Sequence, residues 1–304
     1  MSRRLALAAI SLVAALVPVG GAFASQAATS YPVTITTTAG QTTIPAKPKR
    51  IVSLSATSTE SLFAIGAGKQ VIAVDEQSDY PKSAPKTSLS GFTPNVEAIA
   101  AFRPDLVVIS FDPKGLSEAL RRLGIAVLMH DAPKTLKGAY QQIRQLGAAT
   151  DHGDEAAKVV SGMQRQIARI LETARTRAVG LSVYHELTPD LYSATSSTFI
   201  GRLYAQFGLK NVADAADGAG FGYPQLSSEY IVSSSPNLIV LADSVCCGQT
   251  PGKVGGRPGW STIAAVRTGS IVRIDDSIAS RWGPRLVSFY RAMSTALARL
   301  QKLP

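Results

Sequence analysis

The stretch 135–177 constrains the fold most, because it has helical periodicity and separates two similar halves of the chain. Apolar residues recur in it at steps of three and four, in one stripe that includes Ile143 and Leu146 and in a second that includes Val160 and Ile167. Such spacing is typical of amphipathic helices that pack against other elements. The sequence therefore predicts a helical connection between two folded units.

Within this stretch the sequence indicates the end of one helix and the start of another. Gly147 lies between the two stripes, and either Thr150 or Asp151 is the expected N-cap of the second helix. Asp154 and Glu155 would then lie in the first turn, where the helix dipole favours negative side chains. At 1.5 Å per residue the second helix would be about 35 Å long, which is enough to cross a small domain.

The two halves repeat one pattern. In the first half Glu97 begins a short helical run, Pro104 follows seven residues later, and a run of four apolar residues comes next; Glu229 and Pro236 occupy the same places in the second half. Any two α/β units share some turn residues and strands. A matching glutamate, proline and strand at one constant offset nevertheless favours two related lobes.

The N-terminal residues have the composition of an export signal. Two arginines precede an apolar run over residues 5–19, and an Ala-Phe-Ala cleavage pattern ends at Ala24. The apolar run is shorter than the roughly 20 residues that a membrane span needs, although an uncleaved anchor is the alternative. We therefore expect residues 1–24 to be a signal peptide and the mature protein to be periplasmic, at the cell surface or extracellular.

The only cysteines, Cys246 and Cys247, are adjacent. Neither lies just after the apolar run, so we do not expect the lipid tether that many exported binding proteins carry on a cysteine there. In an oxidising compartment we expect a vicinal disulfide ring or an intermolecular bridge in preference to two free thiols. No histidine is near them in sequence, so we do not expect a metal site.

Elsewhere short apolar runs alternate with helical runs, after a hairpin expected at residues 33–44. Apolar runs without alternation are typical of parallel strands covered by helices on both faces, so each half should be a small doubly wound α/β sheet. The expected boundaries are 25–134 for the first lobe, 135–178 for the helical linker and 179–304 for the second lobe. The expected strands are 51–54, 71–74, 106–109 and 126–129 in the first lobe and 181–185, 238–242 and 271–274 in the second.

The sequence lacks the motifs of the common enzyme classes. It has no nucleophile elbow, zinc-protease helix, P-loop, dinucleotide fingerprint or calcium loop. The three histidines, His130, His152 and His185, are far apart, so no metal site is expected. The formal charge of +10, or +8 without the two arginines of residues 1–24, is scattered, so no nucleic-acid partner is expected. We expect no catalysis and no intrinsic cofactor.

Aromatic and polar residues gather in the turns that follow the expected strands. In open α/β sheets the carboxyl ends of the strands border the ligand crevice, and aromatic rings stack on large flat ligands. A single ring often packs only its own loop, but several such loops favour a ligand site between the lobes. The candidate ligand-binding residues are Gln77, Tyr80, Phe92, Tyr184, Tyr192, Phe221, Tyr223, Arg281 and Trp282.

Several short motifs, in this order, resemble the cobalamin and ferric-siderophore substrate-binding proteins of bacterial ABC importers. The resemblance covers nearly all the chain after residue 24. It implies two α/β lobes joined by a single long α-helix, with the ligand cleft between them. The motifs are Ile51-Val52-Ser53-Leu54-Ser55 with Thr59-Glu60, Ser78-Asp79-Tyr80-Pro81, Val96-Glu97-Ala98-Ile99, Tyr223-Pro224-Gln225-Leu226-Ser227 and Ser280-Arg281-Trp282-Gly283-Pro284-Arg285.

Within this family the cobalamin-binding members are the most similar. The resemblance implies that Tyr223 stacks on the ligand and that Phe92 is the corresponding ring of the first lobe. It also implies that Glu97 and Glu229 pair with arginines on the two copies of the membrane permease.

We therefore expect an exported, monomeric protein that delivers a corrinoid to the permease and ATPase of an ABC importer. The alternatives are a ferric-siderophore or haem binder, a secreted enzyme, and a surface interaction or signalling protein that has lost transport.

Overall fold

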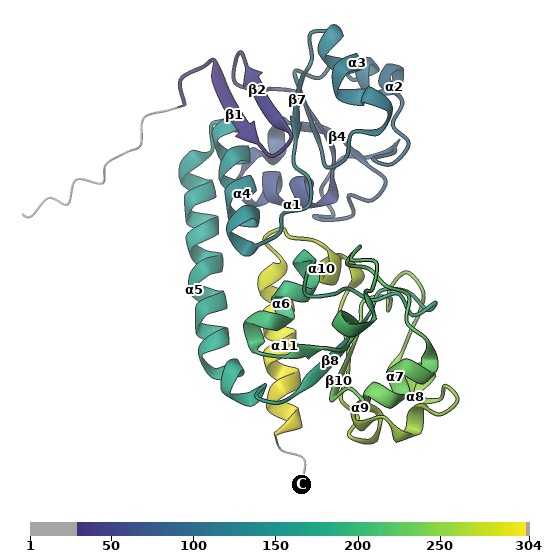
Figure 1. The fold of residues 1–304 in the computed structure, drawn as a ribbon. Coiled ribbons are helices and arrows are strands. Elements are labelled where there is room, and N and C mark those ends of the chain that lie inside the picture. The colour runs from purple at the N-terminus through teal and green to yellow at the C-terminus, as the bar shows by residue number, and fades with distance from the viewer. Residues whose placement is uncertain (1–28, 302–304) are drawn as a thin grey trace, which may run out of the picture.

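The computed structural model describes residues 29–301 and contains two α/β lobes connected by a long helix (Figure 1). The expected signal peptide lies outside the described residues. Within residues 29–301 no helix is both long enough and apolar enough to cross a membrane.

The first lobe contains a hairpin and a five-stranded parallel sheet in the order β5-β4-β3-β6-β7. The predicted strands are all present. The polar edge strand β5 was not predicted, because only Leu89 of its four residues is buried and it lacks an apolar run. The strands are β1 (Val33–Thr37), β2 (Gly40–Ile44), β3 (Ile51–Leu54), β4 (Val71–Asp75), β5 (Lys86–Leu89), β6 (Leu106–Ile109) and β7 (Ala126–Met129); the helices are α1 (Ala56–Ala64), η1 (Ala67–Gln70), α2 (Val96–Ala101), η2 (Pro113–Gly115) and α3 (Leu116–Arg122).

The second lobe has a four-stranded parallel sheet in the order β11-β10-β8-β9. In each sheet the first strand, β3 or β8, has the next strand in sequence, β4 or β9, on one side and the last two strands, β6 and β7 or β10 and β11, on the other, which confirms the predicted repeat. The first lobe has the additional edge strand β5 beyond β4. The strands are β8 (Ser182–Glu186), β9 (Lys210–Asn211), β10 (Leu238–Leu241) and β11 (Ile271–Arg273); the helices are α6 (Phe199–Phe207), η3 (Val212–Ala216), α7 (Ser228–Ser234), α8 (Pro251–Gly255), η4 (Trp260–Thr262), α9 (Ala264–Arg267), α10 (Asp276–Ser280) and α11 (Leu286–Leu300).

The predicted helical stretch is two helices, α4 (Leu136–Thr150) and α5 (Gly153–Arg177), that lie against each other. Only α5 joins the lobes, because α4 packs on α1 and β1 of the first lobe. The predicted N-cap was wrong: His152 precedes α5, and Asp151 ends α4 with a φ of 62°. The carboxylate of Asp151 instead accepts from the Thr29 N–H at 2.9 Å and Lys47 Nζ at 2.8 Å.

One apolar core runs from the first lobe through α5 into the second lobe. The buried face of α5 includes Val160, Met163 and Ile167, and α5 contacts both α4 and α11. Gly147 of α4 permits the close helix pairing, because a Cβ there would lie 2.5 Å from the Cβ of Ala156. The two lobes are therefore joined by side-chain packing as well as by the chain.

Gly162 lies inside α5, with open space around the position of its absent Cβ. Its backbone has no positive φ, and no heavy atom lies within 4 Å of the place that a Cβ would take. Glycine in a helix interior is less favourable than alanine by about 1 kcal/mol.

We expect Gly162→Ala to raise the free energy of unfolding by about 0.5–1 kcal/mol, because the added methyl group meets open space. Urea unfolding followed by circular dichroism measures this change. Gly201→Ala in α6 is the matched control and should destabilise by about 1–3 kcal/mol, because its Cβ would lie 2.0 Å from the Thr195 carbonyl oxygen. Equal effects of the two substitutions would contradict this interpretation.

Candidate functional site

The carboxyl edges of the two sheets face each other. The segment after β11 reaches the first lobe, where Arg281 Nη1 lies 2.7 Å from Asp79 Oδ1 and Arg281 Nη2 donates to the Gln77 carbonyl at 2.8 Å. Asp79 and Gln77 follow β4, so both partners are at strand carboxyl ends. Figure 1 shows α10, which precedes Arg281, between the lobes. In α/β sheets this edge is where ligands bind.

Exposed apolar side chains concentrate at these edges. Seven of the nine large apolar side chains that are exposed within residues 29–301 lie in segments that follow strand carboxyl ends. The other two, Leu123 and Val179, lie elsewhere. Exposed apolar groups that gather on one region of a surface mark interaction sites. The seven are Tyr80, Phe92 and Phe111 in the first lobe and Tyr192, Phe221, Tyr223 and Val245 in the second.

Three of the rings in the second lobe are carried by two paired segments. Tyr192 and Gln225 form an antiparallel bridge, and the Thr195 N–H donates to the Gly222 carbonyl at 2.8 Å. The carboxylate of Asp217 accepts from the N–H groups of Phe221 at 3.1 Å and Gly222 at 2.8 Å. These bonds fix the backbone of the loops that present Tyr192, Phe221 and Tyr223.

In the first lobe, a close backbone approach positions Phe92. A Cβ on the preceding Gly91 would lie 2.7 Å from Asp75 Oδ2 and 3.0 Å from the Leu54 carbonyl oxygen, so only glycine fits there. Ser90 Oγ accepts from the Phe92 N–H at 3.3 Å. Burial raises the pKa of Asp75, whose carboxylate also accepts from Ser78 Oγ. The Phe92 side chain is 68% exposed and available for contact.

Tyr184 is a core residue in the structure, which corrects its expected place in the cleft. It lies within β8 rather than beyond its end, it has no exposed surface, and its ring packs edge-on against Trp260. Its hydroxyl donates to Glu186 Oε2 at 3.2 Å. Trp282 is partly buried against Phe199.

An ion cluster between the lobes holds Arg281. Glu60 of α1 has a side chain that is 2% exposed, and its Oε1 lies 3.2 Å from Arg281 Nη1 and 2.5 Å from Arg285 Nη2. The guanidinium of Arg285 also lies over the ring of Tyr80, 4.2 Å from its centroid. Burial acts to raise the pKa of Asp79, but the hydrogen bond and charge of Arg281 outweigh it and lower that pKa. These charges join the two lobes.

Glu60 and Arg285 were not among the predicted site residues, although both belong to the motifs that resemble the family. In the sequence, a single buried glutamate in a short helix looks the same as an exposed glutamate. Its burial becomes visible only when the second lobe is placed against it.

A second buried charge cluster lies at the ends of β8 and β10. Glu186 is fully buried and accepts from Arg257 Nη1 at 2.6 Å and Nη2 at 2.7 Å. Neither carboxyl oxygen of the buried Asp243 has a hydrogen-bond partner in the part of the chain that the structure describes. Burial, and next the charge of Glu186, raise the pKa of Asp243 to about 7.

The vicinal disulfide lies in the exposed segment that follows Asp243. Cys246 and Cys247 are joined to each other, which is the intramolecular alternative of the two that were expected. Asp276 holds this segment, because its carboxylate accepts from the Val245 N–H at 3.0 Å and from the Cys246 N–H at 2.6 Å.

Asp243 should make stability depend on pH. Because its pKa is about 7 in the folded state and 3.8 ordinarily, the folded chain binds the proton more tightly, and the stability from this group falls as the pH rises from about 4 to about 7. Asparagine does not ionise, so the variant Asp243→Asn does not lose stability through this group as the pH rises. The stability of the variant relative to the wild type should therefore increase from pH 4 to pH 8.

Urea unfolding across this pH range measures the difference, and the buried histidines cancel because both proteins contain them. Asp190→Asn, at an exposed position, is the control and should give a curve parallel to that of the wild type. Parallel curves for Asp243→Asn would contradict the raised pKa.

Among the described residues no three His, Cys, Asp or Glu side chains form a group that could hold a metal ion. The facing edges carry exposed rings, and the charged groups near them are mostly paired to each other.

Comparison with known proteins identifies the family. A sequence model described as periplasmic binding protein matches residues 51–278. The ABC transporter substrate-binding lipoprotein YvrC of Bacillus subtilis (strain 168) is 32% identical over 274 residues, which are 87% of this chain and 85% of that protein. The vitamin B12-binding protein of Pectobacterium carotovorum is 28% identical over 264 residues, with 84% and 90% covered.

Solved structures share the fold. The vitamin B12 binding protein BtuF of Vibrio cholerae aligns with a TM-score of 0.70 and 22% identity over 85% of this chain and 100% of that one. The haem-binding protein RhuT of Roseiflexus aligns with a TM-score of 0.69 and 23% identity over 82% and 99%. Identities this low show the two-lobed fold and leave the ligand open. The chain belongs to the periplasmic binding protein family and is a substrate-binding protein of the ABC-importer type, not an enzyme.

Proposed function

We propose that the protein is exported, captures a corrinoid such as cobalamin between the carboxyl edges of its two sheets, and delivers it to the permease of an ABC importer. The observation that carries this proposal is the set of exposed rings on both facing edges. A large flat ligand with neutral side groups can be held between opposed rings. A relative that covers most of the chain is a vitamin B12-binding protein.

The charges near the site favour a corrinoid over an anionic ferric siderophore. Arg281 and Arg285 are paired with Glu60, and Arg257 is paired with the buried Glu186. A guanidinium that already balances a buried carboxylate has little to offer an anionic ligand, because leaving the carboxylate unpaired costs free energy. Cobalamin has amide side groups, so its binding does not require an arginine to leave its carboxylate partner.

The histidines also disfavour haem as the ligand. Haem iron is commonly held by a histidine side chain. His130 is 2% exposed and His185 is fully buried, and burial lowers their pKa values to about 4 and about 3. His152 lies at the junction of α4 and α5, away from the facing edges. A haem ligand would therefore depend on one of the exposed tyrosines.

We expect purified protein to bind cyanocobalamin in titration calorimetry, and Tyr223→Ala and Phe92→Ala each to weaken binding roughly tenfold or more, because each removes a stacking ring. Leu123→Ala is the matched control, since Leu123 is exposed but lies at the end of α3. Tight binding of haem or a ferric siderophore with no binding of cobalamin would overturn the choice of ligand.

Glu97 and Glu229 are proposed to dock the protein on the permease. Both are exposed in the first turn of equivalent helices, α2 and α7, which are capped by Asn95 and Ser227. No ion pair involves either of them among the described residues. Figure 1 shows α2 and α7 in separate lobes, both on the side away from α5. Two equivalent charges suit a partner built from two equivalent subunits.

The double variant Glu97→Lys/Glu229→Lys should keep its cobalamin affinity and lose transporter binding and cobalamin uptake. Glu155→Lys/Glu172→Lys makes the same charge change on exposed positions of α5 and should leave both properties intact. Uptake that survives in the first double variant would show that the docking assignment is wrong.

A further inference from the structure

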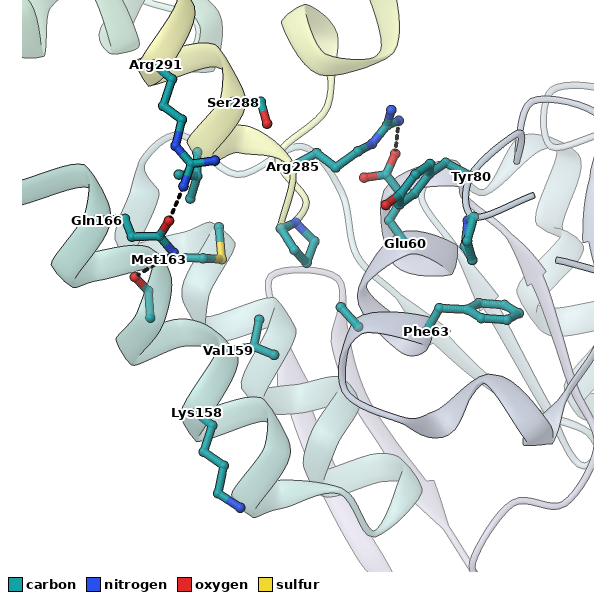
Figure 2. A pocket seen from close by; sticks show the side chains of 15 residues that line it. Glu60, Phe63, Tyr80, Lys158, Val159, Met163, Gln166, Arg285, Ser288 and Arg291 are labelled. Carbon is teal, nitrogen blue, oxygen red and sulfur yellow. Dashed lines mark hydrogen bonds and ion pairs between the residues drawn. The ribbon is translucent and has the colours of Figure 1, made fainter. Parts of the chain in front are cut away.

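A cavity lies beside α5, and Tyr80 is one of the residues that line it (Figure 2). Its volume is about 600 Å³, within the usual range for small-molecule sites. It is lined by α1 and the segment after β4 from the first lobe, by the middle of α5, and by the start of α11 from the second lobe. Apart from Tyr80, none of its lining residues belongs to the proposed cobalamin site.

The lining combines an apolar wall with positive charge. Phe63, Val159, Met163 and Val287 supply apolar surface, and Figure 2 shows Val159 and Met163 on the same helix as Lys158. Apolar walls with a few placed charges are typical of sites for small amphiphilic molecules.

The charges of the lining leave a positive excess. Its cations are Lys158, Arg285 and Arg291, and its only carboxylate, Glu60, is already bonded to Arg281 and Arg285. Arg291 donates to Gln166, which is neutral. Arg285 Nε is buried and has no hydrogen-bond partner among the described residues. The cavity therefore favours an anion over a cation or a neutral molecule.

Gly162 leaves room on the α5 side of this cavity. It lines the cavity, it has no positive φ, and nothing lies within 4 Å of its absent Cβ. Gly153, at the start of the same helix, also meets nothing within 4 Å, but it does not line the cavity. A molecule in the cavity can therefore approach the backbone of α5 at position 162.

We propose that this cavity is a second binding site, for a small anion with an apolar body, such as an aryl sulfonate or a carboxylate with a hydrophobic ring or chain. The apolar body lies along Val159, Gly162 and Met163, and the anionic group lies near Arg291, which is bonded to the neutral Gln166 rather than to a carboxylate. Because both lobes and α5 line the site, an occupant contacts all three. This proposal does not depend on cobalamin being the transported ligand.

The test uses a matched pair of fluorescent probes, 8-anilinonaphthalene-1-sulfonate and the neutral N-phenyl-1-naphthylamine, which lacks the sulfonate. The sulfonate should bind the wild-type protein at one tight site, at least tenfold more tightly than the neutral probe. Gly162→Phe fills the cavity and should weaken binding of the sulfonate at least tenfold. Gly153→Phe is the control, because Gly153 starts the same helix, is exposed, meets nothing within 4 Å and does not line the cavity.

Two further variants test the charge. Arg291→Gln, at an exposed position, should weaken the sulfonate several-fold and leave the neutral probe unchanged. Lys158→Gln, also at an exposed position, is its control and should have a smaller effect, because Figure 2 shows the Lys158 ammonium pointing away from Arg291. Thermal unfolding of each variant verifies that it is folded. Equal binding of the sulfonate by Gly162→Phe and Gly153→Phe would place the probe elsewhere and overturn the site. Equal binding of the two probes by the wild-type protein would overturn its preference for anions.

Discussion

The structure depends on the packing of α5 against both lobes at once. Its apolar stripe, with Val160, Met163 and Ile167, is buried where α4 covers it from the first lobe and α11 from the second. A helix that shares its buried face between two lobes cannot rotate freely relative to either, because rotation would expose apolar surface. The relative placement of the two sheets therefore follows from the pattern of one helix.

Charge completes what apolar packing begins. Glu60 from the first lobe is almost fully buried between Arg281 and Arg285 from the second lobe. Removing one partner of a buried ion pair leaves an unpaired charge and lowers the stability of the fold by more than the intact pair raises it. The cluster therefore favours one relative orientation of the lobes. Both arginines are paired with Glu60, and the exposed side chains at the neighbouring carboxyl edges of the sheets are mainly aromatic rings. The same interaction thus joins the lobes and, under the proposed function, disfavours an anionic ligand.

The sequence predicted the periodic parts of the fold and missed the parts that depend on distant neighbours. The core strands and α2 could be predicted because continuous apolar runs and the Glu-to-Pro spacing are local signals. Tyr184 was placed wrongly because an aromatic near a strand end looks the same whether it points into the core or beyond the edge. Thr150 or Asp151 was expected to cap α5, but Thr150 belongs to α4, and Thr29 and Lys47, which are remote in sequence, bind the carboxylate of Asp151.

The same constraint limits how a ligand can enter. A continuous helix resists bending, because its backbone hydrogen bonds would have to break, and α5 contains no proline. Wide separation of the lobes would also break the contacts of Arg281 and Arg285 with the first lobe. Under the proposed function, the rings on the two edges must already stand close to their bound positions, and Gly91 and the paired segments that carry Tyr192 and Tyr223 fit that arrangement. The proposal therefore implies binding by preorganised side chains rather than by closure of the lobes.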